Sequence, residues 1–175
     1  MSLTDTSAGA AHEIGPGEVI RPTVASDTPR LIELTAATGY FRPEELGTLR
    51  GVLDAFFEEE LPDHCCFTLD LDGRVAGYVY LGVTEEETDG TWYVWWIAVD
   101  PAFQGRGAGR DLLRFGEDEA RRRGARLMFV ETSGLPGYEG TRRFYLKNGY
   151  EREAVLRDYY RDGDDLVVFR KRLVP

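Results

Sequence analysis

A glycine-rich run at residues 104–109, with the sequence QGRGAG, constrains this chain more than any other feature. Apolar and aromatic residues fill residues 92–99 before it, and apolar residues recur at helical spacing over residues 111–123 after it. A strand, a glycine-rich turn and a helix start form an anion site, because unpaired N–H groups point outward there and the helix dipole favours negative charge. Glycines also let a phosphate approach the backbone closely. We therefore predict that this turn binds a phosphorylated cofactor.

Two common phosphate-binding motifs do not fit this run. A Walker loop requires a Gly-Lys-Ser/Thr ending, and the dinucleotide fingerprint requires a different spacing from the glycines at 105, 107 and 109. The pattern Gln/Arg-x-x-Gly-x-Gly/Ala does fit, with Gln104, Gly107 and Gly109. In this pattern the chain resembles the acetyl-CoA pyrophosphate loop of the GNAT N-acetyltransferase superfamily. The alternative is a glycine-rich turn that binds no ligand. Glycines at alternate positions are unfavourable for a plain helix start, because each costs about 1 kcal/mol relative to Ala in a helix.

The order of the predicted elements agrees with this resemblance. Hydrophobic periodicity and turn residues predict strands at residues 19–24, 65–71, 74–83, 92–99, 126–132, 150–156 and 165–172. They predict helices at about residues 26–39, 44–61, 111–123 and 138–147. The short links around residues 111–123 imply a right-handed parallel crossover. We expect an α+β fold of the GNAT type: a mixed, mostly antiparallel central sheet with one parallel βαβ crossover and helices on both faces.

A second motif lies near the C-terminus. Residues 141–150, with the sequence TRRFYLKNGY, resemble the GNAT segment that ends in Leu/Phe-Tyr-x-x-x-Gly-Phe/Tyr. The family's tyrosine often protonates the departing CoA thiolate, and Tyr145 matches it. Attack of an amine on a thioester expels a thiolate, to which a hydroxyl can donate a proton. The alternative is that Tyr145 is a core aromatic residue.

The resemblance also implies where acetyl-CoA binds. The pantetheine arm is expected to pair with the strand edge at Ile97, Ala98 and Val99, beside a gap from the parallel strand at Thr132. An N–H group of that edge can polarise the thioester carbonyl. The pyrophosphate is expected on the run from residue 104 to residue 110. The expected contacts of the run are Gln104, Gly105, Arg106, Gly107, Ala108, Gly109 and Arg110.

The attacking amine must be deprotonated, because its free pKa is about 10.4. Glu131 is the first candidate for the general base, since it lies at a strand end facing the cofactor gap and apolar neighbours raise a carboxylate's pKa. An exposed carboxylate without a catalytic role is an equal alternative. The family often uses ordered water instead.

The acceptor is expected opposite the cofactor entrance, and resemblance places it between two loops that are both aromatic and carry Arg. The expected contacts are Tyr40 and Phe41 in the first loop and Tyr159 and Tyr160 in the second. The arginines are Arg42 and Arg161. The chain departs from the family at Tyr138, where Asn is common. The contact with CoA that this Asn usually makes is therefore in doubt. Tyr138 can instead stack, donate a hydrogen bond from its hydroxyl, or only pack.

Composition narrows the class of partner. The formal charge of −10 argues against binding of a nucleic-acid backbone and weakly favours cationic or amine partners. The two cysteines, Cys65 and Cys66, are adjacent and unlikely to bridge each other, and no metal-ligand spacing is present.

The sequence predicts that residues 1–17 form a flexible tail without a signal peptide and that residues 18–175 form one domain. No apolar run has transmembrane length. We expect a cytoplasmic protein that does not bind membranes, and a homodimer is compatible with the resemblance.

The resemblance therefore implies an acetyl-CoA-dependent N-acetyltransferase that acts on a primary amine within a ternary complex, without a metal. One alternative is a non-catalytic acyl-CoA-binding or regulatory module with the same fold. Another is a transferase that uses a different donor, such as propionyl- or succinyl-CoA. The acceptor amine, either a small molecule or a protein amine, stays open.

Overall fold

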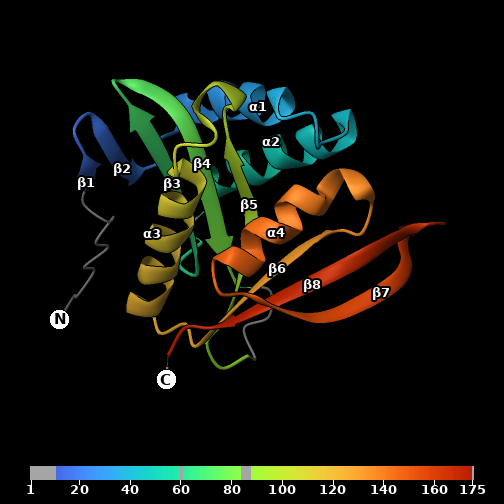
Figure 1. Cartoon of the computed structure of the whole chain (residues 1–175). Coiled ribbons are helices and arrows are strands. Elements are labelled where there is room, and N and C mark those ends of the chain that lie inside the picture. Colours follow the sequence, from blue (N-terminus) through green and yellow to red (C-terminus); the bar gives the residue numbers. More distant parts are fainter. Residues whose placement is uncertain (1–10, 60, 84–87, 175) are drawn as a thin grey trace.

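The computed structural model describes residues 11–59, 61–83 and 88–174 of the chain. Strands of these residues form an eight-stranded sheet in the order β1-β2-β3-β4-β5-β6-β8-β7 (Figure 1). Neighbouring strands are antiparallel except β5 and β6, which are parallel. This architecture confirms the predicted fold class. No helix in the described ranges is long and apolar enough to cross a membrane.

The elements follow the predicted order. The strands are β1 His12–Gly15, β2 Glu18–Pro22, β3 His64–Leu71, β4 Arg74–Gly82, β5 Thr91–Val99, β6 Leu127–Ser133, β7 Glu151–Arg161 and β8 Asp164–Arg172. The helices are α1 Thr28–Ala37, α2 Pro43–Glu58, α3 Ala108–Arg122 and α4 Glu139–Lys147. Short 3-10 turns are η1 Ala25–Asp27, η2 Pro101–Phe103 and η3 Pro136–Tyr138. The turn between β3 and β4 has Asp72 and Gly73 at positive φ (51° and 75°), as the Asp-Gly signal predicts.

The first strand was not predicted. Sequence analysis assigned residues 1–17 to a tail, but His12–Gly15 form β1 and pair with β2 across the turn at Gly17, which has φ 73°. Residues 1–10 of the expected tail lie outside the described residues. Strand β1 is short and has few apolar residues, so neither length nor periodicity marks it in the sequence.

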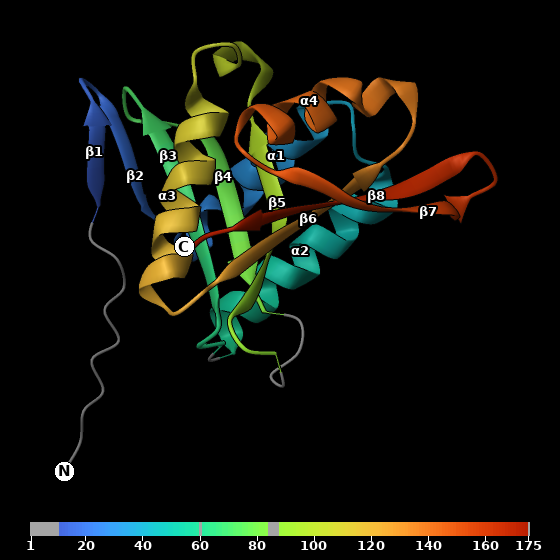
Figure 2. The ribbon, with the colours of Figure 1, turned by 60° about the horizontal axis from the view of Figure 1, so that its bottom comes forward.

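Helices cover both faces of the sheet, as predicted (Figure 2). Helices α1 and α2 pack on one face, where Leu31, Leu34, Leu49 and Leu53 meet Tyr78 of β4. Helix α3 and Tyr145 of α4 pack on the other. The core on that face includes Leu112, Leu113, Val79, Leu81, Met128, Val130 and Phe169. Burial of these apolar side chains on both faces fixes which face each helix covers.

The sheet is split between β5 and β6. The two strands pair only over Thr91–Tyr93 and Leu127–Phe129 and then separate. On its other side β5 stays paired with β4, where Tyr80 opposes Trp96 and Leu81 opposes Val94. Trp95 is therefore the extra residue of a β-bulge, and such bulges bend a strand. The gap predicted from the family resemblance, beside residues 97–99, is present in the fold.

Candidate functional site

A cavity of about 1000 Å³ runs through the gap between β5 and β6. Its lining includes the start of α3 and residues of α4 on one face of the sheet, and the loop between α1 and α2 on the other. Strands β5 and β6 contribute residues 94–99 and 130–133 to its middle. The cavity therefore joins the glycine-rich turn to the predicted acceptor loops.

The glycine-rich turn presents a row of free backbone donors. Helix α3 begins at Ala108, and its N-cap residue is Gly107, which has φ 93°, a conformation that side chains with a Cβ disfavour. The first helical hydrogen bond runs from the Asp111 N–H to the Gly107 carbonyl at 3.0 Å. Within the described ranges, no N–H group of residues 105–110 donates a hydrogen bond to the protein. These amides at a helix N-terminus can bind a phosphate group.

Side chains around this turn line the same end of the cavity. Arg110 and Lys147 line it and supply positive charge. The Gln104 side chain is used within the fold, since its Nε2 donates to the Val99 carbonyl at 2.9 Å and ties the turn to the end of β5. Asp100 acts as a turn residue: its carboxylate accepts from the Ala102 N–H at 2.8 Å and pairs with Arg30. That backbone bond is the main cause that lowers the pKa of Asp100.

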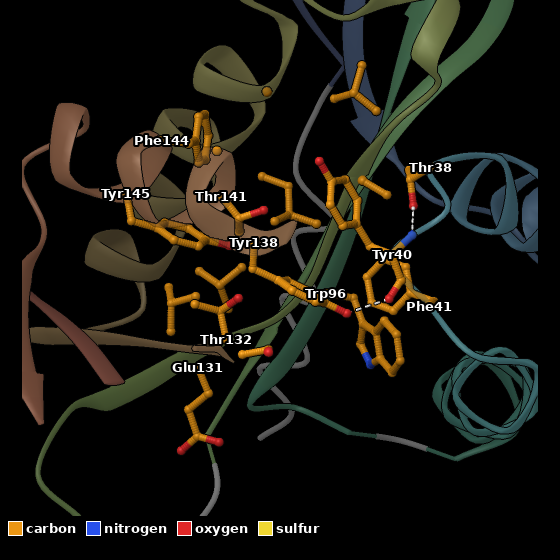
Figure 3. Close-up of a pocket in the computed structure, with 18 of the residues that line it drawn as sticks. Thr38, Tyr40, Phe41, Trp96, Glu131, Thr132, Tyr138, Thr141, Phe144 and Tyr145 are labelled. Atoms are coloured by element: carbon orange, nitrogen blue, oxygen red, sulfur yellow. Dashed lines mark hydrogen bonds between the residues drawn. The ribbon is translucent and has the colours of Figure 1, made fainter. Parts of the chain in front are cut away.

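Tyr145 combines a buried ring with a free hydroxyl. Its side chain is 4% exposed and contacts Phe144, Tyr150 and Phe169 at ring-centroid distances of 5.3, 5.6 and 5.7 Å. Burial raises the pKa of the hydroxyl above its usual value, so it stays protonated at neutral pH. The hydroxyl lines the cavity and has no hydrogen-bond partner among the described residues. Figure 3 shows Tyr145 and Thr132 pointing toward the middle of the cavity. A protonated hydroxyl without a hydrogen-bond partner can donate a proton to a group bound in the cavity.

Arg142, on the same helix, anchors α4 against the end of β6. Its Nη1 donates to the carbonyls of Ser133 and Leu135 at 2.7 and 2.9 Å. The Ser133 hydroxyl in turn donates to the buried carboxylate of Asp164 at 2.5 Å. These bonds hold the positions of α4, β6 and the start of β8 relative to one another, and so the direction in which Tyr145 points.

Glu131 lies on the other face of β6 from Tyr145. Its neighbour Val130 belongs to the core beneath α3, so alternation along the strand places Glu131 on the opposite face. Figure 3 shows its side chain directed away from Tyr145. Desolvation raises the pKa of Glu131 above its usual range, and its charge contributes to the raised pKa values of Tyr93 and Tyr160. The carboxylate borders the cavity, and a proton would reach it through water rather than directly from the middle of the gap.

We call the part of the cavity lined by Tyr40, Phe41, Arg42, Glu45, Trp96, Tyr138, Tyr160, Arg161 and Asp164 the acceptor end. Phe41 packs against Trp96 with ring centroids 5.4 Å apart and the ring planes tilted by 36°. Tyr138 crosses the cavity: its hydroxyl donates to the Tyr40 carbonyl at 2.5 Å, and the two rings lie 5.4 Å apart. The Tyr138 hydroxyl is therefore used within the fold, which joins η3 to the loop between α1 and α2.

Most of the predicted site residues line one cavity. Those that do are Tyr40, Phe41, Ile97, Ala98, Val99, Gln104, Gly105, Gly107, Ala108, Gly109, Arg110, Glu131, Thr132, Tyr138, Tyr145 and Tyr160. Arg106 and Tyr159 lie outside the lining; Tyr159 is exposed and contacts the Tyr160 ring edge-on at 5.2 Å. Ser133, Asp164 and Glu45 were missed, because each is a common polar residue that only the tertiary fold brings to the cavity.

Comparison with known proteins agrees with this geometry. The profile of the acetyltransferase (GNAT) family matches residues 31–150. The chain belongs to this family. A GNAT-family protein from Desulfovibrio desulfuricans has a solved structure that superposes with a TM-score of 0.84 at 35% identity, covering 90% of this chain and 99% of that one.

Two curated relatives come from Bacillus subtilis. S-(2-succino)cysteine N-acetyltransferase is 25% identical over 140 residues, which are 77% of this chain and 84% of the relative. S-alkylcysteine N-acetyltransferase is 30% identical over 122 residues, which are 67% of this chain and 66% of the relative. A further structure, YncA of Salmonella typhimurium with acetyl-CoA, shares the GNAT fold at a TM-score of 0.73 and 21% identity, covering 91% and 96% of the two chains.

Proposed function

We propose that this protein is a single-domain acetyl-CoA-dependent N-acetyltransferase that transfers the acetyl group directly to a small primary amine. The observation that carries the proposal is the Tyr145 hydroxyl, which is protonated, unpartnered and directed into a cavity that continues to six free amides at residues 105–110. A family match alone supports the fold and the class, whereas this arrangement supports catalysis.

Acetyl-CoA would supply the acetyl thioester, and the residues of the cavity fit its parts. The amides of residues 105–110, with Arg110 and Lys147 nearby, suit the pyrophosphate. The edge of β5 that faces the gap suits the amides of the pantetheine arm. Tyr145 would donate a proton to the leaving sulfur, and Glu131 would accept the amine proton through water.

Direct transfer agrees with the state of the two cysteines. Cys65 and Cys66 are buried in β3, and burial raises the pKa of each thiol to about 12. Neither side chain lines the cavity, and neither offers a thiolate that could carry the acetyl group. Both substrates would therefore be bound together, as the continuous cavity permits.

The test is an initial-rate study of CoA release with acetyl-CoA and a panel of amines headed by S-substituted cysteines, because the two Bacillus relatives carry such compounds in their names. Lines that intersect in double-reciprocal plots, with an acetylated amine as product, are expected. Parallel lines together with an acetylated protein would contradict direct transfer. Tight CoA binding without turnover of any amine would instead favour the non-catalytic module. A series with propionyl- and succinyl-CoA identifies the donor.

A further inference from the structure

The acceptor end contains two arginine–carboxylate pairs from separate segments of the chain. At the start of α2, Arg42 Nε lies 3.3 Å from Glu45 Oε2. At the turn between β7 and β8, Arg161 Nε lies 3.6 Å from Asp164 Oδ2. All four side chains border the cavity, so a molecule bound there meets both signs of charge from two directions.

Only one nitrogen of each guanidinium group, Nε, makes a polar contact with another described residue. Each contacts its carboxylate through Nε, and within the described ranges the terminal nitrogens of Arg42 and Arg161 have no hydrogen-bond partner. Their side chains are 62% and 59% exposed, so they are accessible from the cavity. Arg142 differs, because its Nη1 is held by two backbone carbonyls. A free guanidinium fork is the group that binds a carboxylate in a bidentate manner.

The carboxylates of the two pairs already have other bonds. Glu45 accepts the Arg42 backbone N–H at 2.8 Å, and Asp164 accepts the Ser133 hydroxyl. Glu131 differs from both, because it has no hydrogen bond or ion pair among the described residues. The acceptor end thus presents two guanidinium groups whose terminal nitrogens are free, and Glu131 elsewhere in the cavity lining presents a carboxylate without a partner among the described residues.

Both pairs line the same cavity as Tyr138, and the charges of all four residues act on its hydroxyl. Burial is the main cause that raises the pKa of Tyr138; the charges of Glu45 and Asp164 raise it further, while Arg42 and Arg161 lower it. The Tyr138 hydroxyl donates to the Tyr40 carbonyl, which ties η3 to the loop that precedes Arg42. Phe41 and Trp96 add an apolar wall beside the charges.

We propose that the acceptor is a zwitterionic α-amino acid whose carboxylate is bound by Arg42 and Arg161. Its side chain packs against Phe41 and Trp96. Its amino group faces the gap between β5 and β6, on the side of β6 where Glu131 lies. This inference rests on the proposed N-acetyltransferase function and narrows its substrate class. It distinguishes the acceptor from a polyamine and from a polypeptide N-terminus, neither of which carries a carboxylate next to the amine.

The test compares an S-alkylcysteine with its decarboxylated analogue, an S-alkylcysteamine, which keeps the amine and the side chain. Hydrogen bonds to charged groups contribute about 1.5–3 kcal/mol, so the wild-type protein should prefer the amino acid by about 10–150-fold in kcat/KM. Arg42→Gln and Arg161→Gln should each lower kcat/KM for the amino acid by about tenfold or more, mainly through KM, by the same reasoning. Neither variant should affect the analogue.

Matched controls lie on the same elements. Arg50→Gln on α2 and Arg157→Gln on β7 remove exposed arginines outside the cavity, and both should keep the wild-type preference. Equal use of the two compounds by the wild-type protein would overturn the inference, as would a preference for a diamine or a peptide. Equal losses for both compounds in the two variants would overturn it as well.

A binding measurement separates this inference from the proposed function. If no amine is acetylated, the proposed function fails. Calorimetry in the presence of CoA then still shows whether the amino acid binds and the decarboxylated analogue does not. Binding of the amino acid that is lost in Arg161→Gln would support the assigned carboxylate site without turnover, and absence of binding would overturn it.

Discussion

At the scale of single residues, the sequence predicts a role for Tyr145 but not the contacts of its ring and hydroxyl. The motif at residues 141–150 contains Phe144 and Tyr145 as neighbours, and a helix turns them about 100° apart. The structure places the Tyr145 ring in the core and leaves its hydroxyl free in the cavity. The ring thus has the packing expected of a core residue, and the hydroxyl is available for chemistry.

The first prediction concerns that hydroxyl. Tyr145→Phe keeps the ring contacts and removes an oxygen that bonds to no described residue, so folding stability should change little. General acid catalysis contributes roughly 10²–10⁴-fold, so kcat should fall by at least about tenfold even if water substitutes for the donor. Affinity for acetyl-CoA should stay within about threefold, because the lost interaction belongs to the transition state.

Steady-state kinetics and calorimetry on the Tyr145→Phe variant measure these quantities. A variant with the full rate would leave Tyr145 as a packing residue only. A variant that loses acetyl-CoA affinity at unchanged kcat would make it a binding residue.

The second prediction concerns pH and Glu131. A general base acts only when deprotonated, and the pKa of Glu131 is raised by desolvation. The rate should therefore rise with pH through this raised pKa and be lost below it. Glu131→Gln should flatten this acidic limb and lower kcat by about tenfold or more, while CoA affinity is kept.

The control for the pH experiment is Glu151→Gln, which changes an exposed carboxylate on β7 outside the cavity. An unchanged pH profile in Glu131→Gln would assign the acidic limb to water or to the ionisation of the acceptor amine. The position of Glu131 on the far face of β6 makes a complete loss of activity the less expected result, since a proton reaches it through solvent.

At the scale of elements, local patterns predicted most of the fold. The Asp-Gly turn and the switch from alternating to helical periodicity each depend on residues near in sequence. The bulge at Trp95 and strand β1 were not predictable in this way. A bulge depends on register against β4, and β1 exists through its pairing with β2. Glu45 and Asp164 were missed for the same reason, because they are far apart in the sequence and only the tertiary fold brings both to the cavity lining.

The third prediction tests the element proposed to bind the cofactor. Gly107→Glu at the N-terminus of α3 places a side chain and a negative charge at the phosphate site. It should weaken CoA binding by at least about tenfold, because the loss of even one hydrogen bond to a charged group has an effect of this size. Calorimetric titration with CoA measures this change.

Gly124, just beyond the other end of α3, offers a matched control. It has φ 89°, close to the 93° of Gly107, and a Cβ there would meet no atom within 4 Å. Gly107→Glu and Gly124→Glu should therefore share a similar backbone penalty of about 1–2 kcal/mol in folding stability. Only the first should affect CoA binding. Equal CoA affinity in the two folded variants would remove the phosphate assignment from this turn.

At the scale of the whole molecule, the gap between β5 and β6 connects the two helical layers. The strands share only three paired positions, so the sheet near the gap depends on β4 and β8 for its hydrogen bonds. The pairs α1/α2 and α3/α4 lie on opposite faces of this gap (Figure 1). A ligand that fills the gap contacts both layers. Its binding should therefore change the hydrogen exchange of backbone amides and not only the surroundings of one side chain.

The last prediction is a pattern of hydrogen exchange. In the free protein the amides of residues 105–110 have no partner among the described residues, so they should exchange fast. At a CoA concentration about 100 times its Kd, these amides should slow by up to about a hundredfold, the limit set by occupancy. The β1–β2 hairpin lies at the far edge of the sheet and should not change. Tyr145→Phe should keep the wild-type pattern, because it spares binding, whereas Gly107→Glu should lose it. Protection of the hairpin without protection of residues 105–110 would place the CoA site elsewhere in the molecule.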